Sequence, residues 1–269
     1  MAKERDVYAE IPAVQPTLHH ESIQKVHQPI VVAIDVSGSM KYTESGQTKA
    51  NIQLAEEMVN QIGQDPGLSD KYKRTADFCV MSFADHVTTE FDWAPLSHYK
   101  GGIHLTAAGR TAFHDVVKQS LNAVRVMRRS YYDKDIECKR PQIFIITDGY
   151  STDPEDNPSV VKEAKQLCEK YVDTQYVAIH VILLPGGKPG DITGLSDKIM
   201  FYKVDDCAYG LPAIKTFINA SLVAVISSIV GAKPEVELPD ALKTTRPIKQ
   251  NSDGIRTVTE EVLDGLVFR

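Results

Sequence analysis

Cysteine is scarce in this sequence, and its spacing excludes the common cysteine-based sites. Only four cysteines occur among 269 residues: Cys79, Cys138, Cys168 and Cys207. They lie far apart and form no CxxC pair, which argues against a zinc ribbon. Cys79 and Cys168 sit inside apolar segments, a pattern typical of buried free thiols in a reducing compartment.

An excess of positive charge is also missing. The chain has 30 basic and 36 acidic residues, a formal net charge of -6. This balance argues against a nucleic-acid binder and against a protein held on membranes by basic patches. The most apolar region, 211–230, contains Lys215 and Asn219 and is therefore expected to be a core helix and not a membrane span. The first residues contain no apolar stretch of signal-peptide length, so we expect a cytoplasmic protein.

The glycine-rich signatures of several enzyme classes are absent as well. The segment after the first apolar run, DVSGSM (35–40), has one glycine, too few for a dinucleotide-binding turn. No GxxxxGK[ST] segment is present. Asp35 and Ser39 occupy the positions where a hydrolase nucleophile elbow around Ser37 would need glycine. His114 and His180 are the candidate bases, one at a helix start and one in mid-strand. We therefore expect no enzyme, and keep a metal-dependent phosphatase or hydrolase using Asp35 or Ser37 as the alternative.

What the sequence does contain is a regular alternation of strands and helices. A continuous apolar run at 29–35 is typical of a strand buried on both faces, and 141–147 is expected to be another such strand. The segment 176–184 is also expected to be a strand. The segment 86–93 alternates and is expected to be an antiparallel edge strand. Helical spacing of apolar residues follows Lys49, Phe113 and Val160. This order predicts a doubly wound α/β fold, with a mostly parallel sheet and helices on both faces.

The predicted domain covers residues 29–231. A polar arm precedes it at 1–28, and a proline-interrupted extension follows at 232–269.

In such a fold, ligands bind beyond the carboxyl ends of the strands. Asp35, Ser37 and Ser39 follow the first buried strand, Thr111 opens a helix, and Asp148 follows the strand at 141–147. All five offer hard oxygen ligands, which suit Mg²⁺, with Mn²⁺ and Ca²⁺ as alternatives. A simple Asx or Ser turn is the competing explanation of DxSxS, and Thr106 competes with Thr111.

These five residues resemble the metal-ion-dependent adhesion site (MIDAS) of von Willebrand factor A (VWA) domains, and the resemblance covers about residues 28–230. It implies that Ser37 and Ser39 bind the ion through their hydroxyls. Thr111 would bind it directly in one state and through water in another. Asp35 and Asp148 would act largely through ordered water.

The resemblance also implies a function: a protein-interaction module in which a partner's Asp or Glu completes the metal coordination. Arg110 and Tyr150 would lie at the rim of this site. Arg110 either contacts an acidic partner or is solvated, and Tyr150 either contacts a partner or packs against its own loop. The segment DGYSTD (148–153) is most similar to bacterial intracellular VWA proteins associated with tellurium resistance. That likeness implies a role in stress response, with a kinase or phosphatase of the same operon as partner. A scaffold whose metal is purely structural is a further alternative.

Overall fold

The computed structural model describes most of the chain between residues 26 and 203 and a short segment near the C-terminus. The described residues are 26–43, 48–64, 68, 70–149, 151–184, 187, 192, 194–203 and 256–257. The helix predicted at 211–230, Tyr150 and most of the predicted arm and extension lie outside them.

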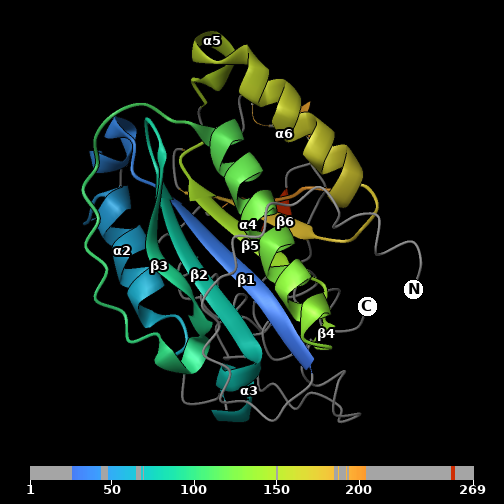
Figure 1. Ribbon diagram of the computed structural model, residues 1–269. Coiled ribbons are helices and arrows are strands. Elements are labelled where there is room, and N and C mark those ends of the chain that lie inside the picture. Colours follow the sequence, from blue (N-terminus) through green and yellow to red (C-terminus); the bar gives the residue numbers. More distant parts are fainter. Residues whose placement is uncertain are drawn as a thin grey trace.

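Within these residues, eight strands form one sheet (Figure 1). They are β1 (Val26–Asp35), β2 (Ala76–Phe83), β3 (Val87–Pro95), β4 (Glu137–Cys138), β5 (Gln142–Thr147), β6 (Ala178–Leu183), β7 (Met200–Lys203) and β8 (Arg256–Thr257). Their spatial order is β3-β2-β1-β5-β6-β7-β8, and β4 pairs with the start of β1. Only the pair β2–β3 is antiparallel, as predicted for the segment 86–93. The strand order changes direction between β1 and β5, which makes their carboxyl ends the expected ligand site.

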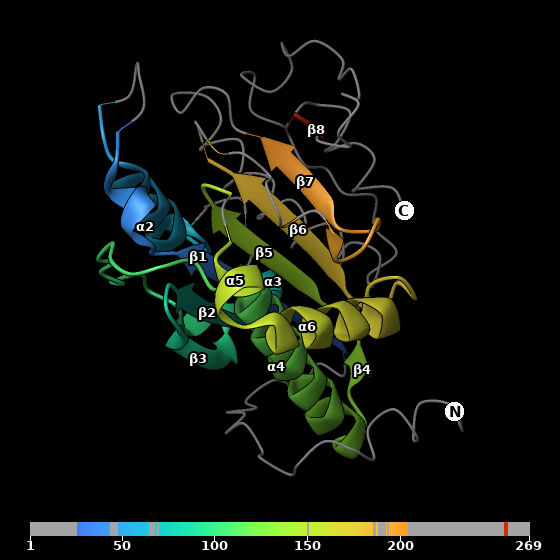
Figure 2. The ribbon, with the colours of Figure 1, turned by 90° about the horizontal axis from the view of Figure 1, so that it is seen from above.

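Helices cover both faces of the sheet. They are α2 (Asn51–Gln61), α3 (Asp70–Thr75), α4 (Phe113–Asp133), α5 (Asp153–Asp156) and α6 (Pro158–Tyr171), with short 3-10 helices η1 (Gly38–Lys41) and η2 (Leu96–His98). Seen from above, α4 and α6 lie on one side of the sheet and α2 on the other (Figure 2). The predicted doubly wound α/β fold is confirmed.

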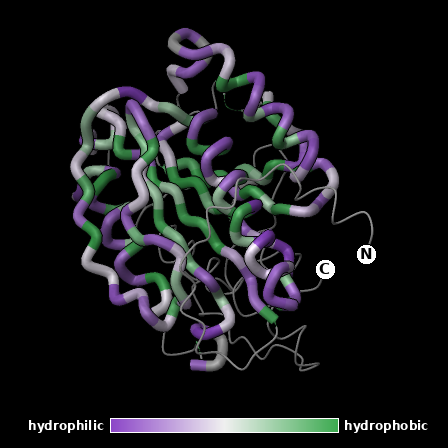
Figure 3. The backbone as a smooth tube through the Cα atoms, viewed as in Figure 1, coloured by the Kyte–Doolittle hydropathy of each residue, from purple (hydrophilic) through white to green (hydrophobic). Residues whose placement is uncertain are grey.

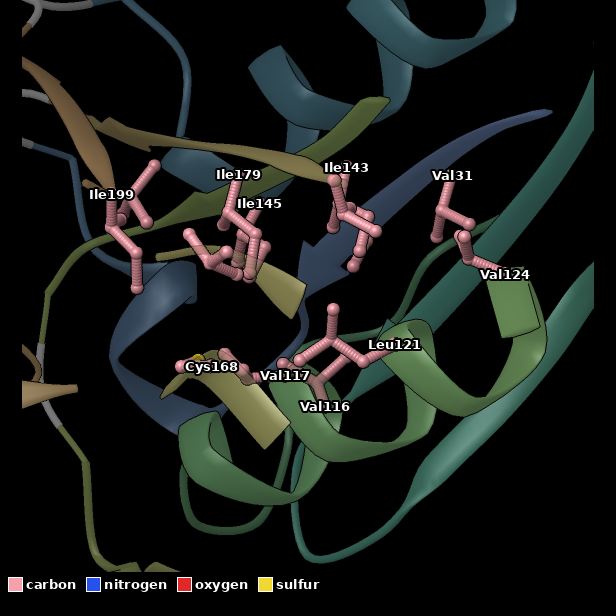
Figure 4. Close-up of a cluster of buried hydrophobic side chains, with 14 of the residues drawn as sticks. Val31, Val116, Val117, Leu121, Val124, Ile143, Ile145, Cys168, Ile179 and Ile199 are labelled. Carbon is pink, nitrogen blue, oxygen red and sulfur yellow. The ribbon is translucent and has the colours of Figure 1, made fainter. Parts of the chain in front are cut away.

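The alternation of side chains along β1 explains why the sheet needs cover on both faces. Ile30, Val32 and Ile34 pack in the cluster that includes α2. Val31 and Ala33 belong to the opposite cluster, which includes side chains of α4 and α6. Figure 4 shows Val31 facing the side chains of α4. Among the described residues, the central strands are accordingly mostly hydrophobic (Figure 3). Each such buried aliphatic side chain contributes roughly 1.5–3 kcal/mol relative to exposure.

Two segments extend the sheet beyond the predicted boundaries. β1 begins at Val26, three residues before the predicted domain start, because Val26 and His27 pair with β4. β8 lies within the predicted C-terminal extension, and it pairs in parallel with β7. A parallel edge strand such as β7 presents unpaired backbone groups, which explains why a short added strand is favourable there.

Cys79 and Cys168 are buried free thiols, as expected, and Cys138 is also free. Among the described residues, none of the helices has the length and hydropathy needed to cross a bilayer.

Candidate functional site

The first predicted ligand, Asp35, ends β1 with its side chain fully buried. Its Oδ1 accepts a hydrogen bond from the backbone N–H of Ser37 at 2.8 Å. Its Oδ2 accepts one from the hydroxyl of Thr147, the last residue of β5, at 2.6 Å. Asp35 therefore links the carboxyl ends of the two strands that flank the switch point.

Ser37 and Ser39 place two hydroxyls together immediately after β1. Ser37 is buried, and the Ser37 Oγ lies 3.0 Å from the Ser39 Oγ. Two oxygens in adjacent positions of an octahedron around Mg²⁺, each 2.0–2.1 Å from the ion, are about 2.9 Å apart. The observed spacing of the hydroxyls thus matches that of two neighbouring ligands of one ion.

The segment that carries Thr111 is tied to this loop through the backbone. The N–H of Gly38 donates to the carbonyl of Gly109 at 3.0 Å, and the N–H of Ala108 donates to the carbonyl of Val36 at 2.8 Å. Thr111 itself is buried. Thr106, its competitor, is exposed. The geometry therefore favours Thr111 as the hydroxyl that belongs to this site.

Asp85, in the turn after β2, forms a hydrogen bond with the backbone of the segment that carries Thr111. Its Oδ1 accepts a hydrogen bond from the backbone N–H of Arg110 at 2.9 Å. Gly109 has a φ of +77°, and a Cβ there would lie 2.5 Å from the Asp85 Oδ2. Glycine at 109 is thus required both by its left-handed backbone and by the close approach of Asp85. Asp85 was not among the predicted site residues, because its neighbours in sequence do not indicate a contact with Arg110, 25 residues away.

Asp148 follows β5 and brings the second carboxylate of the predicted set. It is 8% exposed, and its negative charge acts on Asp35. Burial, with a further contribution from Asp148, raises the pKa of Asp35 to about 7, although the hydrogen bonds from Ser37 and Thr147 oppose that shift. Two buried carboxylates that repel each other are a place where a bound cation would be stabilising.

The donor set therefore fits a hard divalent cation, with oxygen atoms from three loops and no thiol or imidazole among them. In the part of the chain that the structure describes, no three His, Cys, Asp or Glu side chains gather as a metal site. The predicted set does not require such a cluster, since it combines two carboxylates with three hydroxyls. The ligand roles of Asp35, Ser37, Ser39, Thr111 and Asp148 remain predictions.

Of the two predicted rim residues, only Arg110 is described. It is exposed beside Thr111. Tyr150 lies outside the described residues.

The two histidines considered as hydrolytic bases make hydrogen bonds in other parts of the fold. The Nδ1 of His114 lies 3.0 Å from the Ser151 Oγ. His180 lies in β6, where its Nε2 is 2.8 Å from the Gln142 Oε1. Both side chains are buried.

Comparison with solved structures found chains that resemble this one in fold. A structure of proximal thread matrix protein 1 from the mussel byssus has a TM-score of 0.49 at 16% identity, and the match covers 72% of this chain and 48% of that one. The chain thus spans about half the length of the mussel protein. The PilB minor pilin of Streptococcus sanguinis has a TM-score of 0.50 at 12% identity, with 74% and 63% covered. At 12% identity the likeness to the pilin concerns the fold alone.

A further structure of the mussel protein is described as having a zinc-occupied MIDAS motif; it has a TM-score of 0.40 at 20% identity and covers 61% of this chain and 37% of that one. A comparison with curated proteins found no match.

The family model for the von Willebrand factor type A domain matches residues 30–206, well over half of the chain. The match begins within β1 and includes every residue of the predicted metal site. The chain belongs to the von Willebrand factor type A domain family.

Proposed function

We propose that this chain is a metal-dependent protein-interaction module, in which a Mg²⁺ ion held by Asp35, Ser37, Ser39, Thr111 and Asp148 binds a carboxylate of a partner protein. The observation that carries the proposal is the pair of hydroxyls of Ser37 and Ser39, 3.0 Å apart, beside two buried carboxylates. Membership of the VWA family supports it, since these domains mediate protein–protein interactions.

Magnesium is the proposed ion because every donor in the set is a hard oxygen. Mn²⁺ and Ca²⁺ prefer similar ligands and are the alternatives. Zinc is described at the corresponding motif of the mussel protein. Here the absence of thiol and imidazole donors from the set makes zinc the weaker candidate.

The proposed partner presents an Asp or Glu side chain. An octahedral ion has six coordination positions, and the site offers five hydroxyl and carboxylate groups. If some of these groups bind the ion through water, one position can be taken by an oxygen of the partner. The exposed Arg110 would add a positive charge beside that position. A cation on a protein of net charge -6 would accept a carboxylate that the overall charge disfavours.

We propose a binding and not a catalytic role. The Ser37 hydroxyl has Ser39 as its hydrogen-bond neighbour, while His114 lies within hydrogen-bond distance of Ser151 and His180 of Gln142. A serine nucleophile needs an adjacent base to be activated.

The finer assignment rests on the resemblance of residues 148–153 to bacterial intracellular VWA proteins of the tellurium-resistance type. On that basis we propose a cytoplasmic role in stress response, with a kinase or phosphatase of the same operon as the partner.

Capture of partners tests the proposed function. The full chain, immobilised, is exposed to lysate of the cells that produce it in Mg²⁺, in EDTA, and in EDTA followed by excess Mg²⁺. We expect one protein to be retained in Mg²⁺, released by EDTA and recovered when Mg²⁺ returns, because the contact runs through the ion. Asp148→Ala should fail to retain it under any condition. An identical set of bound proteins in all lanes would contradict the proposal.

A further inference from the structure

Asp153 contacts the start of a helix other than its own. It begins α5, yet its Oδ2 accepts hydrogen bonds from the backbone N–H groups of His114 at 2.5 Å and Asp115 at 3.3 Å. These are the second and third residues of α4, and Ala112, which precedes that helix, offers no side-chain oxygen. A buried carboxylate from a distant segment therefore supplies the missing N-terminal cap of α4.

The two residues before Asp153 reinforce this contact. The N–H of Thr152 donates to the carbonyl of Thr111 at 2.9 Å, and the Thr152 hydroxyl donates to the same carbonyl at 3.3 Å. The Ser151 Oγ lies 3.0 Å from the Nδ1 of His114. We call residues 151–153 the clasp, because three consecutive residues hold the segment from Thr111 to Asp115.

The clasp joins two of the loops that carry predicted metal ligands. It begins three residues after Asp148, and it contacts Thr111 and the helix that Thr111 precedes. These contacts are made to the backbone carbonyl of Thr111 and to backbone N–H groups of α4, and none of them needs the ion. They would therefore hold Thr111 in place as preorganisation of a metal ligand requires.

We propose that Asp153 is a positioning residue for the metal site, acting through Thr111 and not on the ion itself. This rests on the proposed function. The competing explanation is that Asp153 merely caps α4, in which case its removal lowers stability and leaves metal affinity unchanged. A measurement of metal affinity on folded protein distinguishes the two explanations, because only the positioning role predicts weaker metal binding.

The test is a calorimetric titration of the full chain with Mg²⁺, for variants shown to be folded by circular dichroism. Asp153→Ala is expected to weaken Mg²⁺ binding about tenfold, while Asp153→Asn, which keeps an oxygen acceptor for the helix N–H groups, should restore most of the affinity. Asp115→Ala removes one negative charge from the first turn of α4, where the side chain is partly buried and pairs with Lys118, and should stay within about twofold of the original protein. Should Asp153→Ala fail to fold, Asp153→Leu, which has a similar volume and no oxygen acceptor, takes its place with the same expected loss.

A double-mutant cycle with Thr111→Ala supplies the decisive comparison. If Asp153 acts through Thr111, adding Asp153→Ala to Thr111→Ala should cost no further affinity, because the residue being positioned is already gone. An equal loss in both backgrounds, or no loss in the Asp153→Ala single variant, would overturn the positioning role and leave the proposed metal site intact. A wild-type chain that binds no Mg²⁺ would overturn both.

Discussion

Replacement of Asp148 by alanine is expected to weaken Mg²⁺ binding by about 10- to 100-fold, the usual cost of removing a group that orients metal ligands through water. Asp148 is 8% exposed and lies close enough to Asp35 for their charges to interact. Removing it takes away half of the negative charge that would attract the ion. Calorimetric titration with Mg²⁺ measures the loss directly.

The same substitution should have an opposite consequence in the absence of metal. In EDTA, Asp148→Ala relieves the repulsion of Asp35 and is expected to leave thermal stability unchanged or slightly raised. In Mg²⁺, the unsubstituted protein gains about 2.7 kcal/mol at a concentration 100 times the Kd, and the variant gains far less. Asp133→Ala, an exposed change at the far end of α4, controls for net charge. A variant that Mg²⁺ stabilises as strongly as the original chain would refute the role of Asp148.

The stability of the fold at acid pH is expected to depend on His180. This side chain is fully buried in β6, stacked against Phe144 with ring centroids 4.8 Å apart and against Tyr202 at 5.8 Å. Its Nε2 donates to the Gln142 Oε1, which leaves the Nδ1 to accept a hydrogen bond from the Tyr202 hydroxyl at 3.2 Å. Burial, assisted by the positive charge of Arg140, lowers the pKa of His180 to about 3.

The direction of the pH dependence follows from that lowered pKa. The unfolded chain binds a proton at His180 below about pH 6.5, and the folded chain does not bind it until about pH 3. The contribution of His180 to stability is therefore fully present above pH 6.5. It is lost as the pH falls towards 3, at a limiting slope of about 1.4 kcal/mol per pH unit.

Urea unfolding in EDTA at pH 7.5 and pH 5 measures this contribution. Between these two pH values the original chain should lose about 2 kcal/mol more stability than His180→Gln, which has no titrating ring. His86→Gln, at an exposed position after β2, should leave the pH dependence of the original chain unchanged. Parallel pH profiles for the original chain and His180→Gln would show that His180 is not the group responsible.

The central strands could be predicted from the sequence because a strand buried on both faces is made of consecutive apolar residues. Residues 30–34 and 143–146 are uninterrupted apolar runs, and they form the core of β1 and β5. Segment 86–93 alternates because β3 is an edge strand with one exposed face, and its antiparallel pairing is confirmed. The two-residue strands β4 and β8 were not predicted, since two residues carry no periodicity.

The sequence could place the candidate ligands at one edge of the sheet, but it could not predict the residues that hold their loops. DxSxS, Thr111 and Asp148 could be placed at one edge because carboxyl ends of parallel strands converge there. Asp85 and Asp153 act on backbone groups 25 and 39 residues away, and their own neighbours in sequence give no sign of those contacts. The position of Asp153 shortly before Pro158 suggests a cap for the helix that begins there, but its carboxylate caps α4 instead. Only the packing of α4 against the loop after β5 shows this.

The most direct test of a metal held by these loops is anomalous scattering from crystals of the full chain grown with Mn²⁺, which substitutes for Mg²⁺ at oxygen-rich sites. The account predicts one strong peak between the hydroxyls of Ser37, Ser39 and Thr111 and the carboxylates of Asp35 and Asp148. A fully occupied manganese peak elsewhere on the protein, with none among these five side chains, would contradict it.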